Sequence, residues 1–229
     1  FGLCSWTMSP SFLFVLKAQN NQIERQKLFG YIETYLVRRT FCKSKNNNYS
    51  DLFSENLIGQ GVNTYEAFKS YVNNSSARGA LLMPSDDDLR NAIANEDQKR
   101  NASVLLYMLE SKMNDSFTDS EYTNGYSDFI TEQVMPEKSN EAWATPTYSS
   151  EDRDRLTRTI GNFVLLREKL KASDKKANWD RKKVAMKERA DELDTSAVVT
   201  RGLSNWTEST IEARNKWFAD MAIEFWPLK

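Results

Sequence analysis

The sequence of 229 residues contains no histidine. Histidine is the side chain that most often acts as a general base or a metal ligand near neutral pH. A catalytic or metal site in this chain must therefore be built from other residue types. The two cysteines, Cys4 and Cys42, are too few for a zinc site or a disulfide framework, which favours reduced thiols in a cytoplasmic protein.

The sequence also lacks long apolar runs and a large net charge. The longest apolar run, Phe12 to Leu16, is far shorter than the roughly 20 residues that cross a bilayer, so we expect no membrane partner. The formal net charge is −1, and a polyanionic partner would therefore have to meet a local basic patch. Because the chain opens at Phe1 within an amphipathic pattern, we expect it to be the C-terminal part of a longer protein.

The first half of the chain has the apolar spacing of helices. Apolar residues recur every three or four positions from Asn21 to Cys42, and shorter helices are predicted over Thr64 to Val72 and Asn101 to Met113. Ser85 followed by three aspartates predicts the capped start of another helix. Arg38 and Arg39 could contact DNA or a preceding N-terminal domain, or they could form the polar side of the long helix or anchor it by pairing with carboxylates such as this aspartate cluster. We expect a structural use.

The second half adds two β-type segments. A stretch rich in Asn, Asp, Ser and Gly over residues 114–127 marks a boundary, so we predict a helical subdomain over 1–114 and a second subdomain over 115–229. The β-type segments are Phe129–Met135, stopped by Pro136, and Phe163–Leu166.

Helices are predicted between and after these segments. They comprise a charged helix from Glu151, a basic helix over Lys175 to Ala190 and a last helix over Thr207 to Trp226. Five tryptophans fall at apolar-face positions and are assigned to packing: Trp143, Trp179, Trp206, Trp217 and Trp226.

The basic helix lies in the most strongly charged part of the sequence. From Arg167 to Arg189 there are ten basic residues and four acidic ones, a local net charge of +6. Such a segment suits contacts with backbone phosphates, and the alternative is a solvated helix face. The candidates for nucleic-acid binding are Lys175, Lys176, Arg181, Lys182 and Lys183.

Six short motifs follow one another along the chain. They are Tyr35-Leu36-Val37-Arg38-Arg39, Met83-Pro84-Ser85-Asp86, Thr131-Glu132-Gln133-Val134-Met135-Pro136, Ile160-Gly161-Asn162-Phe163-Val164-Leu165-Leu166, Trp179-Asp180-Arg181-Lys182-Lys183, and a closing helix from Trp206 through Arg214 to Trp226-Pro227. This ordered set resembles the C-terminal domain of GmrSD-type, modification-dependent (type IV) restriction endonucleases, which belongs to the His-Asn-His nucleases. The resemblance covers nearly the whole chain.

The resemblance implies an endonuclease domain of an anti-phage restriction protein that acts on modified phage DNA. In that family an N-terminal nucleotide-hydrolysing domain, absent from this sequence, precedes the nuclease. A carboxylate holds a divalent metal ion, Mg or Mn, against the scissile phosphate, a histidine activates water, and an asparagine orients the histidine or the phosphate. Carried over by motif, Glu132 falls on the metal-ligand position, Gln133 on the general-base position and Asn162 on the middle asparagine. Lys171 falls on a further asparagine position.

Two of these positions depart from the family pattern. Glutamine does not titrate near neutral pH and cannot take a proton from water, and a general base typically contributes about 10²–10⁴-fold to the rate. Lys171 would oppose a second positive charge at close range, so binding of a divalent ion should suffer. Whether the chain is an enzyme is therefore open.

Three hypotheses follow from these departures. In the first, Lys171 substitutes electrostatically for the metal ion and Glu132 acts as the base. In the second, which we favour, the domain is a degenerate nuclease that keeps its fold and its DNA-facing charge. In the third, it is a non-catalytic DNA-binding or protein-interaction module that couples the nucleotide-hydrolysing domain to DNA.

The fold class that we predict is α+β, mostly α. A helical N-terminal subdomain should accompany a ββα-metal nuclease element and a C-terminal helix layer. We expect the two strands to pair across a long loop, with the basic helix crossing them. A cleft is expected beside Glu132, Asn162 and Lys171.

Overall fold

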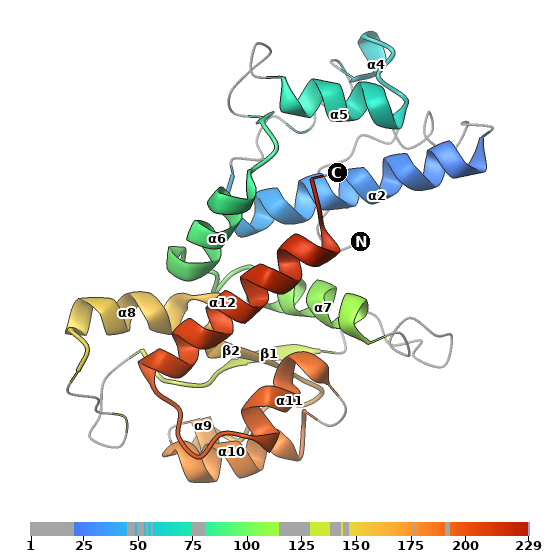
Figure 1. Cartoon of the computed structure of the whole chain (residues 1–229). Coiled ribbons are helices and arrows are strands. Elements are labelled where there is room, and N and C mark those ends of the chain that lie inside the picture. Colours follow the sequence, from blue (N-terminus) through green and yellow to red (C-terminus); the bar gives the residue numbers. More distant parts are fainter. Residues whose placement is uncertain are drawn as a thin grey trace. The chain divides into compact units, whose positions relative to one another are not determined.

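The structure is a computed structural model that describes residues 21–44, 49, 53, 55, 57–74, 81–114, 129–137, 143, 147–175, 177–190 and 193–228. Over these residues it is mostly helical, with one antiparallel pair of strands, which confirms the predicted α+β class (Figure 1). None of the helices in these ranges is both long enough and apolar enough to cross a membrane. The described residues fall into two compact units, one formed by those from 21 to 89 with 226–228 and the other by those from 90 to 225.

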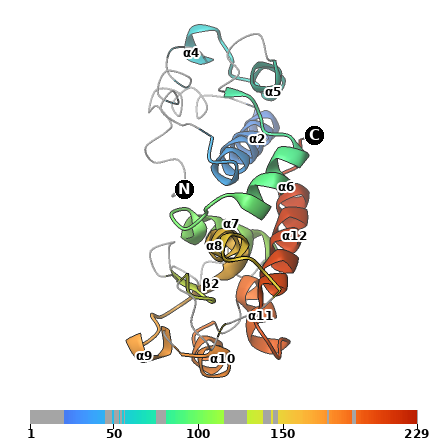
Figure 2. The same ribbon diagram turned by 90° about the vertical axis from the view of Figure 1, so that its left-hand side faces the viewer.

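The first unit is built on α2 (Gln22–Phe41), the long helix predicted from its apolar spacing. It begins where the Asn21 side chain accepts hydrogen bonds from the backbone N–H groups of Ile23 and Glu24. Helix α5 (Tyr65–Asn73), capped by Thr64 as the sequence suggests, packs beside α2 (Figure 2), and α4 (Leu57–Gly59) is a short turn. Their shared core includes Leu28, Tyr31, Ile32, Tyr35, Leu57, Phe68 and Val72.

Arg38 is a fully buried anchor of this unit. Its guanidinium donates hydrogen bonds to the carbonyl oxygens of Pro84 (3.0 Å) and Trp226 (2.8 Å) and forms an ion pair with Asp86 at 2.6 Å. The neighbouring Arg39 donates to the Tyr49 hydroxyl and to the carbonyl oxygen of Leu82. The structural use predicted for both arginines is therefore confirmed.

Helix α6 (Asp86–Asn95) starts at the predicted serine cap. The Ser85 hydroxyl accepts a hydrogen bond from the backbone N–H of Asp88 (3.1 Å), and the Asp88 carboxylate accepts one from the backbone N–H of Ser85 (2.9 Å). Hydrogen bonds from Ser85 lower the pKa of Asp88 below its ordinary value. The three aspartates lie in the first turn, where the positive end of the helix dipole favours negative charge.

The second unit holds the two strands. β1 (Ile130–Gln133) and β2 (Phe163–Leu166) pair antiparallel, with Glu132 opposite Val164 and Gln133 opposite Phe163. Helix α7 (Ala102–Met113) contacts both strands and lies on one side of them, whereas α10 (Trp179–Lys187) lies on the other (Figures 1 and 2). Helix α8 (Ser150–Arg158) and the short η6 (Ile160–Asn162) lead into β2. Helix α12 (Glu208–Phe225) packs on α8 and on η6.

Helix α7 packs on the strands and lies in the same compact unit. The buried face of α7 includes one charged residue. Val104 and Met108 are only partly buried, while Leu106 and the charged Glu110 are buried beside Leu105 and Leu109. Trp143, Trp179, Trp206 and Trp226 are buried, in agreement with their assignment to packing, and Trp217 is partly buried.

The prediction of one basic helix over Lys175 to Ala190 is wrong. The structure has α9 (Ala172–Lys175) and then α10, which starts anew where the Asn178 side chain accepts a hydrogen bond from the backbone N–H of Arg181. The asparagine competes for backbone donors and so favours a helix start over a helix interior.

Helix α11 (Asp194–Arg201) was not predicted from the sequence. Its first turn is capped by Glu110 of α7, whose carboxylate accepts hydrogen bonds of 2.8 Å from the backbone N–H groups of Asp194 and Thr195 and from the Thr195 hydroxyl. Burial raises the pKa of Glu110, although these hydrogen bonds oppose that shift. A cap supplied by a residue so distant in the sequence leaves no local signal.

Replacing Arg38 by alanine should lower the free energy of unfolding by about 3 kcal/mol, because it removes a hydrogen bond to each of two carbonyl oxygens and breaks a partly buried ion pair. Urea unfolding followed by circular dichroism measures this change. Lys27→Ala, an exposed position of the same helix, is the matched control and should change stability by less than about 0.5 kcal/mol. Equal effects of the two substitutions would contradict the anchoring role.

Candidate functional site

The carboxylate of Glu132, at the predicted metal-ligand position, is covered by a lysine side chain. This carboxylate lies 2.5 Å from the ammonium group of Lys175, the last residue of α9. The Glu132 side chain is 10% exposed and that of Lys175 is 45% exposed. The ammonium group therefore faces solvent and the carboxylate lies behind it.

A second lysine lies close to the same carboxylate. Lys182 of α10 is only 3% exposed, and its ammonium group donates a hydrogen bond to the carbonyl oxygen of Lys175 (3.2 Å). It also lies 5.9 Å from the centre of the Trp143 ring. Burial lowers the pKa of Lys182 to about 8; the negative charge of Glu132 opposes this shift and the positive charge of Lys175 adds to it. Lys182 thus supports the site from inside the fold, away from the surface that a phosphate would approach.

Gln133, at the predicted general-base position, is bound to a different element. Successive residues of a strand project to opposite faces, and the Gln133 amide donates a hydrogen bond to the carbonyl oxygen of Thr157 in α8 (2.7 Å). The structure therefore separates Gln133 from the Glu132 carboxylate, which turns toward α9. Lys171, the other substituted position, is exposed just before α9.

Asn162 is fully buried and uses its whole hydrogen-bonding capacity. Its side-chain oxygen accepts from the backbone N–H of Met135 (2.9 Å) and from the indole of Trp206 (3.1 Å). Its side-chain nitrogen donates to the carbonyl oxygens of Met135 (2.9 Å) and Thr157 (2.8 Å). An amide offers two donors and two acceptor sites, so all are occupied. Asn162 and Gln133 meet at the Thr157 carbonyl oxygen, and Asn162 ties the end of β1 to α8.

Helix α12 holds the turn that carries Asn162. A side chain on Gly161 would lie 2.5 Å from both the Asn215 side chain and the Ile211 carbonyl oxygen, so only glycine allows this close approach. The fully buried Arg214 donates to the carbonyl oxygens of Gly161, Phe163 and Thr195. The sequence predicts no buried role for Asn215 or Arg214, because polar residues on an amphipathic helix normally face solvent.

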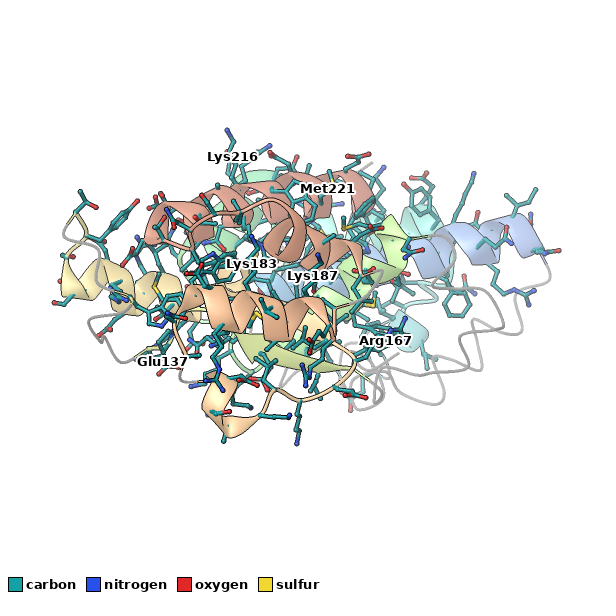
Figure 3. All side chains as sticks on the ribbon, turned by 90° about the horizontal axis from the view of Figure 1, so that it is seen from below. Glu137, Arg167, Lys183, Lys187, Lys216 and Met221 are labelled. Carbon is teal, nitrogen blue, oxygen red and sulfur yellow. The ribbon has the colours of Figure 1, made fainter. Side chains whose placement is uncertain are left out.

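The exposed cations of the predicted nucleic-acid-binding set lie on and before α10. Arg181 is 63% exposed and forms an ion pair with Asp174 at 3.0 Å. Lys183 is partly buried and donates to the carbonyl oxygen of Leu203. Lys183, Lys187 and Arg167 are visible on one face in Figure 3. Lys176 lies outside the described residues.

The residues around Glu132 do not fit a divalent metal ion. One carboxylate faces the ammonium groups of Lys175 and Lys182, which would repel a second cation in a poorly solvated site. Within the described ranges, no group of three or more His, Cys, Asp or Glu side chains is arranged to hold a metal. The sequence motifs predicted Lys171 as the opposing charge, whereas Lys175 makes the direct contact with Glu132.

Comparison with known proteins identifies one family. Residues 83–221, more than half of the chain, match the family model described as the C-terminal domain of GmrSD restriction endonucleases, which confirms the resemblance drawn from the motifs. The match includes Glu132, Gln133, Asn162 and Lys175. No curated protein and no solved structure matches the chain.

Replacing Gly161 by alanine should lower the free energy of unfolding by about 3 kcal/mol, since the added methyl group meets a backbone oxygen that cannot move away alone. Thermal or urea unfolding of the purified variant tests this. Gly202→Ala is the matched control, because nothing lies within 4 Å of a side chain added there. A Gly161 variant as stable as the control would refute the close packing of α12 on this turn.

Stability should depend on the protonation of Lys182 in alkaline solution. Its pKa is about 8 in the folded chain and ordinarily 10.5, so the unfolded chain binds more protons between these values. The titration of Lys182 should therefore add about 2 kcal/mol to the free energy of unfolding as the pH increases from 7 to 10. Below pH 8 both states are protonated and the cost of burying the charge is present in full.

Lys182→Met removes the titrating group and keeps most of the apolar stem. Urea unfolding at pH 7 and pH 10 should show a rise in stability that is about 2 kcal/mol smaller in this variant than in the wild-type chain, whereas Lys187→Met, at an exposed lysine of the same helix, should keep the wild-type rise. The comparison between variants cancels the titration of other groups. An unchanged rise in Lys182→Met would show that this lysine is not desolvated in solution.

Proposed function

This chain belongs to the family of C-terminal domains of GmrSD restriction endonucleases, and we propose that it binds DNA but has lost the histidine-and-metal route to cleavage. The observation that carries the proposal is the ion pair between Glu132 and Lys175 at the position where the family pattern needs a metal ligand. In addition, the amide of Gln133 occupies the position of the general base. Both parts of the catalytic centre are therefore replaced.

The contacts of Gln133 support the loss of base catalysis. Its amide nitrogen is used by the Thr157 carbonyl oxygen, which leaves only an amide oxygen to accept a hydrogen bond from water. An amide oxygen orients a water molecule but does not remove its proton at neutral pH. The Glu132 carboxylate is a poor substitute, because the ammonium group of Lys175 binds one of its oxygens and covers it.

The basic residues around α10 support retained DNA binding. Lys171, Arg181 and Lys187 are exposed, and Lys183 is partly exposed beside them. Neutralising several backbone phosphates gives affinity that falls steeply with salt and needs no metal ion. In this proposal the domain serves an anti-phage restriction protein in the cytoplasm. It meets modified phage DNA there, together with an N-terminal nucleotide-hydrolysing domain.

The chain should not nick supercoiled plasmid, modified or unmodified, in Mg²⁺ or Mn²⁺. Its activity should equal that of Glu132→Ala, the matched background control, on an agarose gel. Gln133→His should also stay inactive, because Lys175 still excludes the ion. Metal-dependent nicking by the wild-type chain that disappears in Glu132→Ala would defeat the proposal.

A further inference from the structure

The positive charge beside Glu132 is the ammonium group of Lys175, which lies where a metal ion was expected. Lys175 approaches the carboxylate to 2.5 Å, and its side chain is the more exposed member of the pair. An ammonium group has three hydrogen-bond donors, of which Glu132 uses one. A ligand that arrives from solvent therefore meets a positively charged donor before it meets the carboxylate.

The charge at this point is positive overall. Behind Lys175, the ammonium group of the buried Lys182 adds a second cation to a single carboxylate. The nearby Asp174 does not cancel the excess, because its carboxylate pairs with Arg181 at 3.0 Å. Lys171 contributes a further exposed cation, and its carbonyl oxygen accepts the backbone hydrogen bond of Lys175 (3.1 Å). Such a cluster attracts an anion and repels a divalent cation.

We propose that Lys175, with Lys182 behind it, forms a metal-independent subsite for one backbone phosphate of DNA. The inference rests on the proposed DNA-binding function and goes further, because it assigns one phosphate contact to the former metal position. The ammonium group supplies the positive charge that a bound ion supplies in a metal-dependent nuclease. On binding, Lys175 directs its remaining donors to phosphate oxygens while Glu132 continues to hold its position.

The test measures the affinity of the full chain for a fluorescent DNA duplex by anisotropy, in EDTA and in Mg²⁺, over a range of salt concentrations. Wild-type affinity should be the same with and without the chelator. Lys175→Ala should bind about threefold to tenfold more weakly, with a salt dependence reduced by the contribution of about one phosphate contact. Lys216→Ala, at an exposed lysine of α12 (Figure 3), controls for the general loss of one charge and should retain the affinity and salt slope.

Glu132→Gln separates the phosphate subsite from a metal site. Removal of the carboxylate frees Lys175 and should tighten DNA binding in EDTA by about threefold, since the negative charge that competes with phosphate is lost. A metal site would behave in the opposite way: binding would need Mg²⁺ and would weaken in Glu132→Gln. This variant keeps the test decisive if circular dichroism shows that Lys175→Ala does not fold.

The failure of this inference is distinguishable from that of the proposed function. Wild-type binding with unchanged affinity in folded Lys175→Ala would overturn the subsite and leave DNA binding in place. Affinity that depends on Mg²⁺ would also overturn the subsite. Absence of binding at about 50 mM salt, where phosphate contacts are strong, would overturn the proposed function itself.

Discussion

The second unit depends on the buried amide of Asn162. Its four hydrogen bonds join the end of β1, the last turn of α8 and the Trp206 indole, which come from three separate stretches of the chain. An unpaired polar group at this depth would cost about 1–3 kcal/mol, so the native arrangement is strongly favoured over alternatives that leave any bond unmade. The absence of a side chain on Gly161 lets α12 close over the same turn.

The hydrogen bonds of Asn162 do not depend on which side chains occupy positions 132 and 133. None of its four hydrogen bonds uses the side chain of Glu132 or Gln133, and Gln133 merely shares the Thr157 carbonyl oxygen with it. The strand pair can therefore persist while the residues that would carry out catalysis change. The same independence explains why family membership and catalytic competence are separate questions for this chain.

Local patterns predicted most elements, and tertiary contacts account for the rest. The apolar spacing of α2, the Ser85 cap of α6 and the β-type run of β2 are all local signals, and each element formed close to its predicted bounds. The start of α11 depends on Glu110, far away in the sequence. Likewise, the motif alignment identified Glu132 but pointed to Lys171 as its opposing charge, because the turn of α9 that brings Lys175 forward has no counterpart in a linear comparison.

The lysine pair at Glu132 contributes little to the stability of the fold. An ion pair with a half-exposed partner is worth about 0–1 kcal/mol, whereas burial of a second ammonium group is a large cost, visible in the lowered pKa of Lys182. A methionine would fill the place of Lys182 without that cost. Clusters that oppose stability in this way are typical of binding sites, where the charge is offset when the ligand arrives. An anionic ligand offsets the excess positive charge of two ammonium groups that face one carboxylate.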